Sequence, residues 1–320
     1  MKFYERSFYS QWNKLVHQAK NATFLFHRDF MEYHQDRFQD ASAVVFKNDK
    51  PIAVFPANKV EKTVFSHQGL TYGGLVYNTK LKFHSVLEIF KILLQFYESH
   101  GFDSLQLKQL PAMYSSVPNA EISYLMFLLG AKLMRRDMLS VVNLSEKIAF
   151  SKDRKDGVKR AIKNNLVVKN DNLFEDFWNT ILIPNLKAKH EAKPVHSLEE
   201  IKLLHKRFPD NIKQFNVYKD DKLVAGTTVF ITENVVHSQY ISGNANKNQL
   251  GSLDFLHDYL LKKAFNDMPF FDFGISNENQ GKQVNSGLLY WKEGFGARSI
   301  TQDFYAVPLA NHEKLNNVML

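Results

Sequence analysis

The stretch Tyr290-Trp-Lys-Glu-Gly-Phe-Gly-Ala297 has an earlier counterpart in the same chain, Tyr124-Leu-Met-Phe-Leu-Leu-Gly-Ala131. In both stretches a Tyr stands six residues before the last Gly, and an Asp follows that Gly by seven residues (Asp137 and Asp303). Recurrence of both order and spacing indicates an internal duplication. The sequence therefore predicts two copies of one α/β unit.

The segments upstream of these two stretches repeat as well. Val44–Phe55 and Phe215–Gly226 each read as strand, turn, strand, with Asp49 and Asp221 in the turns. Apolar spacing then predicts helices over Ser85–His100 and Ser252–Asn266, each leading into a strand, at Ser104–Leu107 and Phe270–Phe273. A further helix near Glu121 or Asn285 and a last strand, at Leu139–Leu144 or Phe304–Val307, complete each copy. We expect the order β-β-(β)-α-β-α-β in both copies.

Length and composition are those of an ordinary globular protein. The chain has 320 residues, 44% hydrophobic and 23% charged, which fits two domains with real cores. It has no Cys, so disulfides, thiolate catalysis and Cys-ligated zinc are excluded. No apolar run approaches the length of a membrane span, and the twelve His lack ligand spacing. We expect a cytoplasmic enzyme or binding protein without a metal.

The formal net charge of +8 is concentrated between the two copies. Seven basic residues fall within 151–169, against two Asp: Lys152, Arg154, Lys155, Lys159, Arg160, Lys163 and Lys169. Residues 151–165 read as a basic helix. Charge alone does not choose among DNA, RNA, a nucleotide-sugar and coenzyme A. We divide the chain at this helix, into domains 1–148 and 149–320.

The order of elements resembles the N-acetyltransferase (GNAT) superfamily, and the tandem arrangement resembles its Fem-like branch of aminoacyltransferases. The match lies in Ser66-His-Gln-Gly-Leu-Thr-Tyr-Gly-Gly74, in the basic segment Lys152–Lys163, and in Phe271-Asp-Phe-Gly274 followed by Tyr290-Trp-Lys292. It spans about Tyr4 to Val307. The resemblance implies an α/β (α+β) chain of two tandem GNAT-like domains, each a mixed twisted sheet flanked by helices, that transfers an acyl group to an amine.

The resemblance assigns the chemistry to the second domain and the acceptor side to the first. Tyr290 matches the Tyr that protonates the leaving group in GNAT enzymes, and Lys292 matches a Lys of Fem proteins that contacts acceptor or intermediate. Asp272 is a candidate base, or the cap of a turn. Trp291 joins the substrate contacts. Burying Lys292 would cost several kcal/mol, so the sequence predicts that it faces a wet cleft.

The donor's phosphates are expected at the start of the helix at Ser252, where free N–H groups favour anions. The residues there are Gln249, Gly251 and Ser252, although Asn248 and Leu253 depart from the usual Gly-rich signature. An ordinary Gly-Ser turn is the alternative. The donor is acyl-CoA (acetyl-CoA) or, as in Fem-type enzymes, aminoacyl-tRNA.

Two further groups are candidate substrate contacts. His67, Tyr72 and Gly73 belong to the region that lines the acceptor groove in the family, or to a loop that needs its glycines for positive φ. Arg154, Lys159 and Arg160 could grip an acceptor diphosphate. A solvated helix face is the other interpretation of that second group.

The function predicted is an N-acyltransferase that moves an acetyl or aminoacyl group to an amine of an anionic cell-envelope sugar or peptide precursor, with acyl-CoA as donor. Its partners are then a small-molecule or nucleotide-linked amine acceptor, with tRNA as a second candidate and no DNA. One alternative is an aminoacyl-tRNA-dependent Fem-type transferase. The other is a binding protein that keeps the fold without catalysis. The sequence leaves the oligomeric state open.

Overall fold

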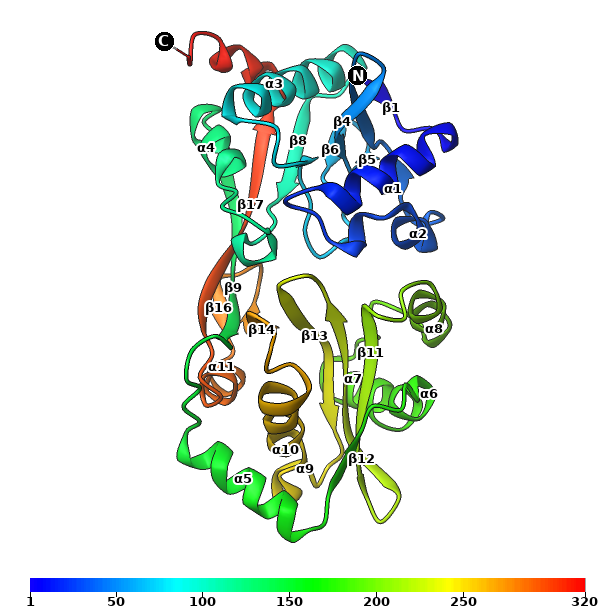
Figure 1. The fold of residues 1–320 in the computed structure, drawn as a ribbon, viewed down its shortest axis with the longest axis vertical. Helices are drawn as coiled ribbons and strands as arrows, with labels where there is room; N and C mark the ends of the chain where they lie inside the picture. Colours follow the sequence, from blue (N-terminus) through cyan, green and yellow to red (C-terminus); the bar gives the residue numbers. More distant parts are fainter. Residues whose placement is uncertain (320) are drawn as a thin grey trace. The chain divides into compact units, whose positions relative to one another are not determined.

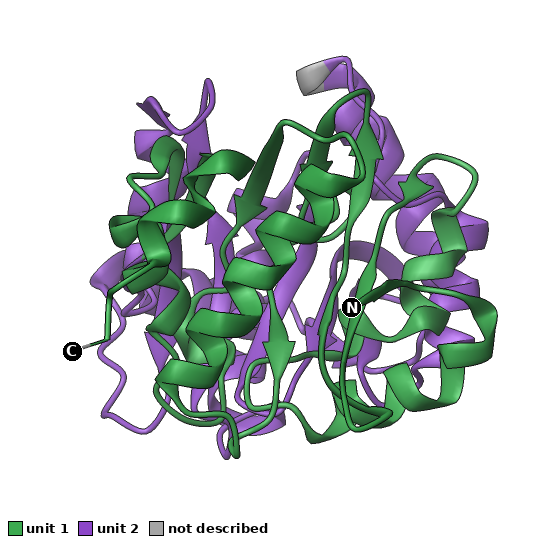
Figure 2. Ribbon diagram, turned by 90° about the horizontal axis from the view of Figure 1, so that it is seen from above, with its two compact units in different colours: residues 1–137, 301–320 green, residues 138–300 purple. Residues whose placement is uncertain are grey.

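The computed structural model describes residues 1–319, which form two compact units (Figure 2). Unit 1 combines Met1–Asp137 with the C-terminal segment from Thr301, and unit 2 is Met138–Ile300. Strand β9 (Lys132–Asn143) begins in unit 1 and ends in unit 2, whereas β17 (Arg298–Pro308) begins in unit 2 and ends in unit 1. Both units therefore draw on both repeats, so they differ from a division of the chain at 148/149.

Unit 1 contains two sheets. One has the order β1-β3-β4-β7, and the other runs β17-β8-β6-β5-β2, in which β6 and β8 are parallel. The remaining strands are β1 (Lys2–Phe3), β2 (Gln39–Asp40), β3 (Ala43–Lys47), β4 (Lys50–Phe55), β5 (Asn58–Val60), β6 (Thr63–Phe65), β7 (Val76–Tyr77) and β8 (Ser104–Lys108). The helices are α1 (Tyr9–Gln18), α2 (Arg28–Met31), α3 (Phe83–Ser99) and α4 (Glu121–Leu128).

Helix α3 organises the core of unit 1, as the apolar spacing predicts. Val86, Phe90 and Leu93 are fully buried on one stripe of the helix. Tyr97, on the same stripe, donates its hydroxyl to the Ala41 carbonyl at 2.8 Å, so its polar end is satisfied inside the core. Gly101, with φ of 83°, follows the end of the helix.

The two predicted hairpins turn in the same way. Asn48 and Asp49 have φ of 50° and 59° between β3 and β4. Asp220 and Asp221 have φ of 48° and 57° between β11 (Ile212–Lys219) and β12 (Lys222–Ile231). Two consecutive left-handed residues match the twist of a tight hairpin, and Asn and Asp adopt that conformation more readily than most residues. The shared turn confirms the upstream part of the repeat.

Unit 2 contains one mixed sheet, ordered β10-β11-β12-β13-β14-β9, in which only β13 and β14 are parallel. Its strands are β10 (Val167–Lys169), β11 (Ile212–Lys219), β12 (Lys222–Ile231), β13 (Val235–Gly243) and β14 (Phe270–Ile275), with a separate pair β15 (Asn277–Glu278) and β16 (Gln283–Val284). Its helices are α5 (Lys152–Lys163), α6 (Phe174–Phe177), α7 (Ile183–His190), α8 (Leu198–Arg207), α9 (Lys247–Leu250), α10 (Ser252–Tyr259) and α11 (Ser286–Glu293).

Two π-helical turns adjust the helices of unit 2. One, Trp178–Leu182, joins α6 to α7, and the other, Leu260–Ala264, extends α10. Pro184 lies in the first turn of α7, the part of a helix that tolerates a residue without an N–H.

Both repeats follow the predicted order. The first runs β3, β4, then α3, β8, α4 and β9, with the short strands β5, β6 and β7 before α3 (Figure 1). The second runs β11, β12, β13, then α10, β14, α11 and β17, with the short helix α9 before α10 and the pair β15 and β16 before α11. The fold class predicted from the sequence is therefore confirmed. Among residues 1–319, no helix combines the length and the apolar character needed to cross a membrane.

Candidate active site

The parallel strands β13 and β14 are paired over a short stretch only. The register joins Val235 to Phe270, Val236 to Phe271 and His237 to Asp272. β13 continues to Gly243, but β14 turns at Gly274, whose φ of 71° suits glycine. β14 also shifts its register against β9 between Asp272 and Ile275. The parallel ladder therefore ends at one His–Asp pair.

His237 and Asp272 are hydrogen-bonded at this point. His237 Nδ1 lies 3.0 Å from Asp272 Oδ2, and the Gly274 N–H donates to Oδ1 at 2.7 Å. The carboxylate is 1% exposed, whereas the imidazole is 14% exposed. A proton on Nδ1 shared with the carboxylate leaves Nε2 as the acceptor. The geometry is that of a base oriented by a third group.

Sequence reasoning identified Asp272 but missed His237. Nothing in Val235-Val-His-Ser-Gln marks this His among twelve, because its partner lies 35 positions away in the chain. The signal exists only in the register of two parallel strands. Had Asp272 been placed on β14 and paired with the preceding strand, the His opposite it would have been the residue to test.

Lys292, on α11, lies beneath the end of β14. Its Nζ donates to the carbonyls of Gly274 at 3.0 Å and Ile275 at 2.6 Å. Burial lowers the pKa of Lys292 to about 8, with the Asp272 carboxylate opposing the shift. The predicted wet cleft is wrong for this side chain, which is 2% exposed. Hydrogen bonds to the two carbonyls satisfy the Lys292 ammonium in place of the water that the prediction assumed.

Neighbouring side chains tie three helices of unit 2 together. Trp291 Nε1–H donates to Asp254 Oδ1 at 3.1 Å, and Arg154 Nη1 reaches the same oxygen at 2.5 Å. Burial raises the pKa of the Asp254 carboxyl, against the influence of Arg154. Arg154, predicted to grip an acceptor diphosphate, is thus engaged in an ion pair between α5 and α10. Trp291 also packs edge-on against His257.

Tyr290 lies on the outer side of α11. It is 59% exposed, and its hydroxyl donates to Asp153 Oδ2 at 2.7 Å. That hydrogen bond raises the pKa of Tyr290 above its ordinary value. A Tyr with a raised pKa holds its proton more firmly. The role of proton donor to the leaving group stays a prediction for this residue.

The start of α10, predicted to receive the donor's phosphates, is packed against α5. Gly251 has φ of 70°, and a Cβ there would lie 2.0 Å from the Gly157 carbonyl oxygen. Ser252 is fully buried, and its hydroxyl has no hydrogen-bond partner. Gln249 is exposed. Asp254 carries a negative charge in this first helical turn, the place where a bound anion is favoured.

The outward face of α5 remains basic. Lys159 is exposed and pairs with Asp156 at 3.4 Å, and Arg160 is exposed. Three other basic residues of this helix are exposed as well: Lys152, Lys155 and Lys163. This row, which we call the α5 basic face, is suited to contact with phosphates.

The predicted acceptor contacts lie in unit 1. His67 is 5% exposed with φ of 65°, and its ring stacks on His34 at 5.1 Å. Burial lowers the pKa of His67 to about 3, so its ring is neutral and weakly basic at pH 7. Tyr72 is buried, and its hydroxyl donates to Thr23 Oγ1 at 3.0 Å. At Gly73, a Cβ would lie 2.0 Å from the Ser66 carbonyl oxygen.

Comparison with known proteins finds the same fold in solved structures. FemX matches with a TM-score of 0.68 at 10% identity, covering 95% of this chain and 97% of FemX. The C-terminal domain of a putative lysylphosphatidylglycerol synthetase from Agrobacterium fabrum matches with a TM-score of 0.59 at 11% identity, covering 97% and 95%. No family model and no curated protein matches the sequence.

A third structure addresses the duplication directly. It is a tandem GNAT protein from the clavulanic acid biosynthesis pathway, with a TM-score of 0.52 at 12% identity over 95% of this chain and 96% of that one. The chain has the Fem-related tandem GNAT fold. Within this fold, the His237–Asp272 pair and Lys292 mark the end of the parallel β13–β14 ladder.

Proposed function

We propose that the chain is an N-acyltransferase whose reaction takes place in unit 2, at the end of the β13–β14 ladder. The observation that carries the proposal is the His237–Asp272 pair, because it combines a partly exposed base with a buried carboxylate that orients it. The likeness in fold to FemX and to a tandem GNAT protein supports the same class of reaction.

The amine acceptor must lose a proton to attack an acyl carbonyl. His237 Nε2 is proposed to take that proton, while Asp272 fixes the tautomer and stabilises the imidazolium that forms. A positioned base of this kind contributes about 10²- to 10⁴-fold in rate. As the new C–N bond forms, the bond from the acyl carbon to the sulfur of coenzyme A, or to the ester oxygen of aminoacyl-tRNA, breaks, and the leaving group takes up a proton in turn. Holding donor and acceptor together supplies a further ~7–11 kcal/mol, so no covalent intermediate is required.

Lys292 is proposed to hold the backbone and Asp272 of this site in place rather than to contact the substrate. Two of its three N–H groups hold the carbonyls at the break in β14. With a pKa of about 8, the side chain is mostly protonated at pH 7 and places positive charge beside Asp272. That charge favours the ionised carboxylate and hence the orientation of His237.

We propose acyl-CoA as the donor, with Gln249, Gly251 and Ser252 as its expected contacts. Of these three residues Gln249 is the exposed one, whereas the Ser252 hydroxyl, which has no hydrogen-bond partner, is fully buried. Aminoacyl-tRNA is the second candidate, favoured by the α5 basic face and by the likeness to FemX. The acceptor is proposed to be an amine on an anionic sugar or peptide of the cell envelope, with His67, Tyr72 and Gly73 as candidate contacts.

Transfer of a labelled acyl group tests the proposal. The full chain is incubated with labelled acetyl-CoA or labelled aminoacyl-tRNA and a panel of amino-sugar phosphates and lysine-containing peptides. We expect transfer from one donor, and loss of transfer in His237→Ala. Transfer from tRNA alone, reduced by charge reversal at Lys152 and Lys155, would select the second donor. Absence of transfer from both donors would contradict the proposal and favour the non-catalytic alternative.

A further inference from the structure

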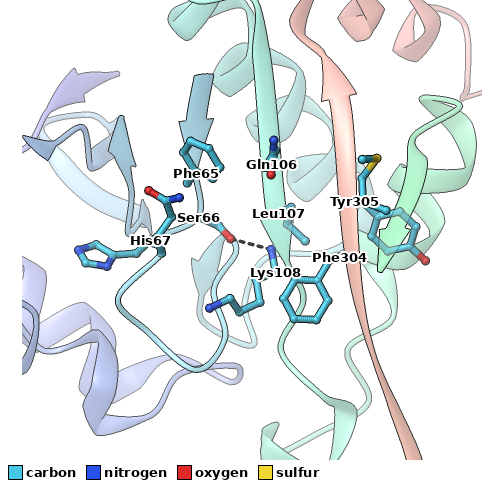
Figure 3. A pocket seen from close by; sticks show the side chains of 10 residues that line it. Phe65, Ser66, His67, Gln106, Leu107, Lys108, Phe304 and Tyr305 are labelled. Carbon is cyan, nitrogen blue, oxygen red and sulfur yellow. Dashed lines mark hydrogen bonds between the residues drawn. The ribbon is translucent and has the colours of Figure 1, made fainter. Parts of the chain in front are cut away.

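Unit 1 holds a cavity of about 260 Å³ where β6 and β8 part (Figure 3). The two strands are parallel through Phe65 and Gln106, and the chain then leaves β6 at Ser66 and returns to pair Gly73 with Gln109. The intervening loop keeps the strands apart. Of the three candidate acceptor contacts in unit 1, His67 is among the lining residues of this cavity, and Tyr72 and Gly73 are not.

Five of the ten lining residues are apolar or aromatic, and the other five are polar: Ser66, His67, Gln68, Gln106 and Lys108. Phe65 and Leu107 come from β6 and β8, Phe304 and Tyr305 come from β17, and Met134 comes from β9. Figure 3 shows the Phe304 ring next to the Lys108 side chain. These side chains suit the hydrocarbon or aromatic part of a small molecule.

Among the described residues that line the cavity, Lys108 is the one Lys or Arg, and it forms no ion pair with an acid in the described part of the chain. Lys108 Nζ donates to the Leu70 carbonyl at 2.5 Å, which uses one of the three N–H groups of the ammonium. The nearby Arg135 is held by Asp137 through two hydrogen bonds of 2.8 and 2.7 Å. Burial lowers the pKa of Lys108 to about 8, so the ammonium remains mostly charged at pH 7. The cavity therefore carries about one net positive charge.

Phe304 places this charge next to an aromatic surface. Lys108 Nζ lies 6.0 Å from the centre of the Phe304 ring, and the Arg135 guanidinium carbon lies 4.7 Å from it. A ligand anion on Lys108 would thus be within reach of an apolar wall. Figure 3 shows the His67 ring turned away from Lys108 and Phe304.

We propose that this cavity binds a small monocarboxylate with an apolar or aromatic body, its carboxylate on Lys108 and its body against Leu107 and Phe304. One cation favours one negative charge, because Arg135 is already paired with Asp137. An amine, which is positively charged at pH 7, would be repelled by the Lys108 ammonium. A phosphate dianion would lack a second free cation.

Calorimetric titration of the full chain at pH 7 tests the proposal with four probes. Phenylacetate has the proposed charge and body, 2-phenylethanol and 2-phenylethylamine change the charge, and inorganic phosphate lacks the body. We expect phenylacetate to bind at least tenfold more tightly than each of the others. Equal binding of phenylacetate and 2-phenylethanol, or tighter binding of phosphate, would overturn the proposal.

Variants locate the site. Lys108→Met is expected to weaken phenylacetate binding at least tenfold, whereas Lys62→Met, which removes an exposed lysine of the same unit, leaves it unchanged. Met134→Trp, at an exposed wall residue, fills the cavity without touching a buried charge and also abolishes binding. Binding that survives both Lys108→Met and Met134→Trp would place phenylacetate elsewhere and reject the site. These titrations measure binding alone, so their failure leaves the proposed transfer in unit 2 untouched.

Discussion

Each unit contains a pair of parallel strands that is paired over a short stretch only, and different side chains lie where the pairing ends. In unit 2 the parallel pair β13 and β14 ends at His237 and Asp272, and Lys292 donates hydrogen bonds to two carbonyls just beyond this point of β14. In unit 1 the parallel pair β6 and β8 ends at a cavity, with Lys108 bonded to a single carbonyl. Both units therefore share a short pair of parallel strands. The side chains at its end form a His–Asp pair in unit 2 and line a cavity in unit 1.

The two lysines make the comparison quantitative. Burial lowers the pKa of both Lys292 and Lys108 to about 8. Lys292 has a carboxylate, Asp272, beside it, whereas the acid nearest Lys108, Asp137, is bonded to Arg135. The unit 1 lysine is therefore the one with charge left for a bound anion.

Replacing His237, the proposed base of unit 2, tests the comparison with the largest expected effect. His237→Ala is expected to lower kcat/KM for acyl transfer by about 10²- to 10⁴-fold, because the acceptor loses its proton acceptor. His17→Asn, at an exposed position of α1, is the matched control and should leave kcat/KM unchanged. Full activity in His237→Ala would assign the chemistry to another group.

The contact that holds α10 against α5 in unit 2 can be broken next. Gly251→Ala places a Cβ 2.0 Å from the Gly157 carbonyl oxygen at a φ of 70°. Backbone strain and overpacking together are expected to lower the free energy of unfolding by roughly 2–5 kcal/mol. In Gly287→Ala the new Cβ meets nothing closer than 3.8 Å, and Ala favours the helix. Urea denaturation should separate the two variants, and equal stability would contradict the tight contact.

The lowered pKa of Lys292 makes the stability of the protein depend on pH in the alkaline range. Its folded pKa is about 8 and its ordinary value is 10.5, so the unfolded chain binds more protons between these values. Stability of the parent should therefore rise with pH relative to Lys292→Met across this window, by up to about 3 kcal/mol. The difference is measured by denaturation at pH 7 to 10.5, with exposed Lys152→Met as control. A flat difference would mean that the ammonium is hydrated.

His67 gives unit 1 a pH dependence of the same sign, but in acid. Because burial lowers its pKa from 6.5 to about 3, stability is lost as the pH falls below 6.5, where only the unfolded chain takes the proton. His67→Asn keeps a residue that tolerates the positive φ and should reduce the loss between pH 7 and pH 5 by about 2 kcal/mol. Thermal denaturation at the two pH values tests this, and an unchanged acid loss would argue for a hydrated ring.

The sequence predicted the order of elements because that order depends on local signals. The spacing in α3 and the Asp-containing turns at Asp49 and Asp221 are readable within a dozen residues. His237 was not readable, because its role depends on the register between two strands separated by a helix. The burial of Lys292 was missed for the same reason, since its partners Gly274 and Ile275 become available only where β14 breaks.

The location of β17 has a practical consequence for dividing the chain. Val307, Leu309 and Leu315 are buried in the core built around α3, so the first unit is completed by a segment that is synthesised after all of unit 2. A fragment ending at residue 148 would expose that core, and so would a full chain trimmed before Thr301. Unit 1 can therefore finish folding only after residues 138–300 have been synthesised, although its α3 and β8 are made much earlier.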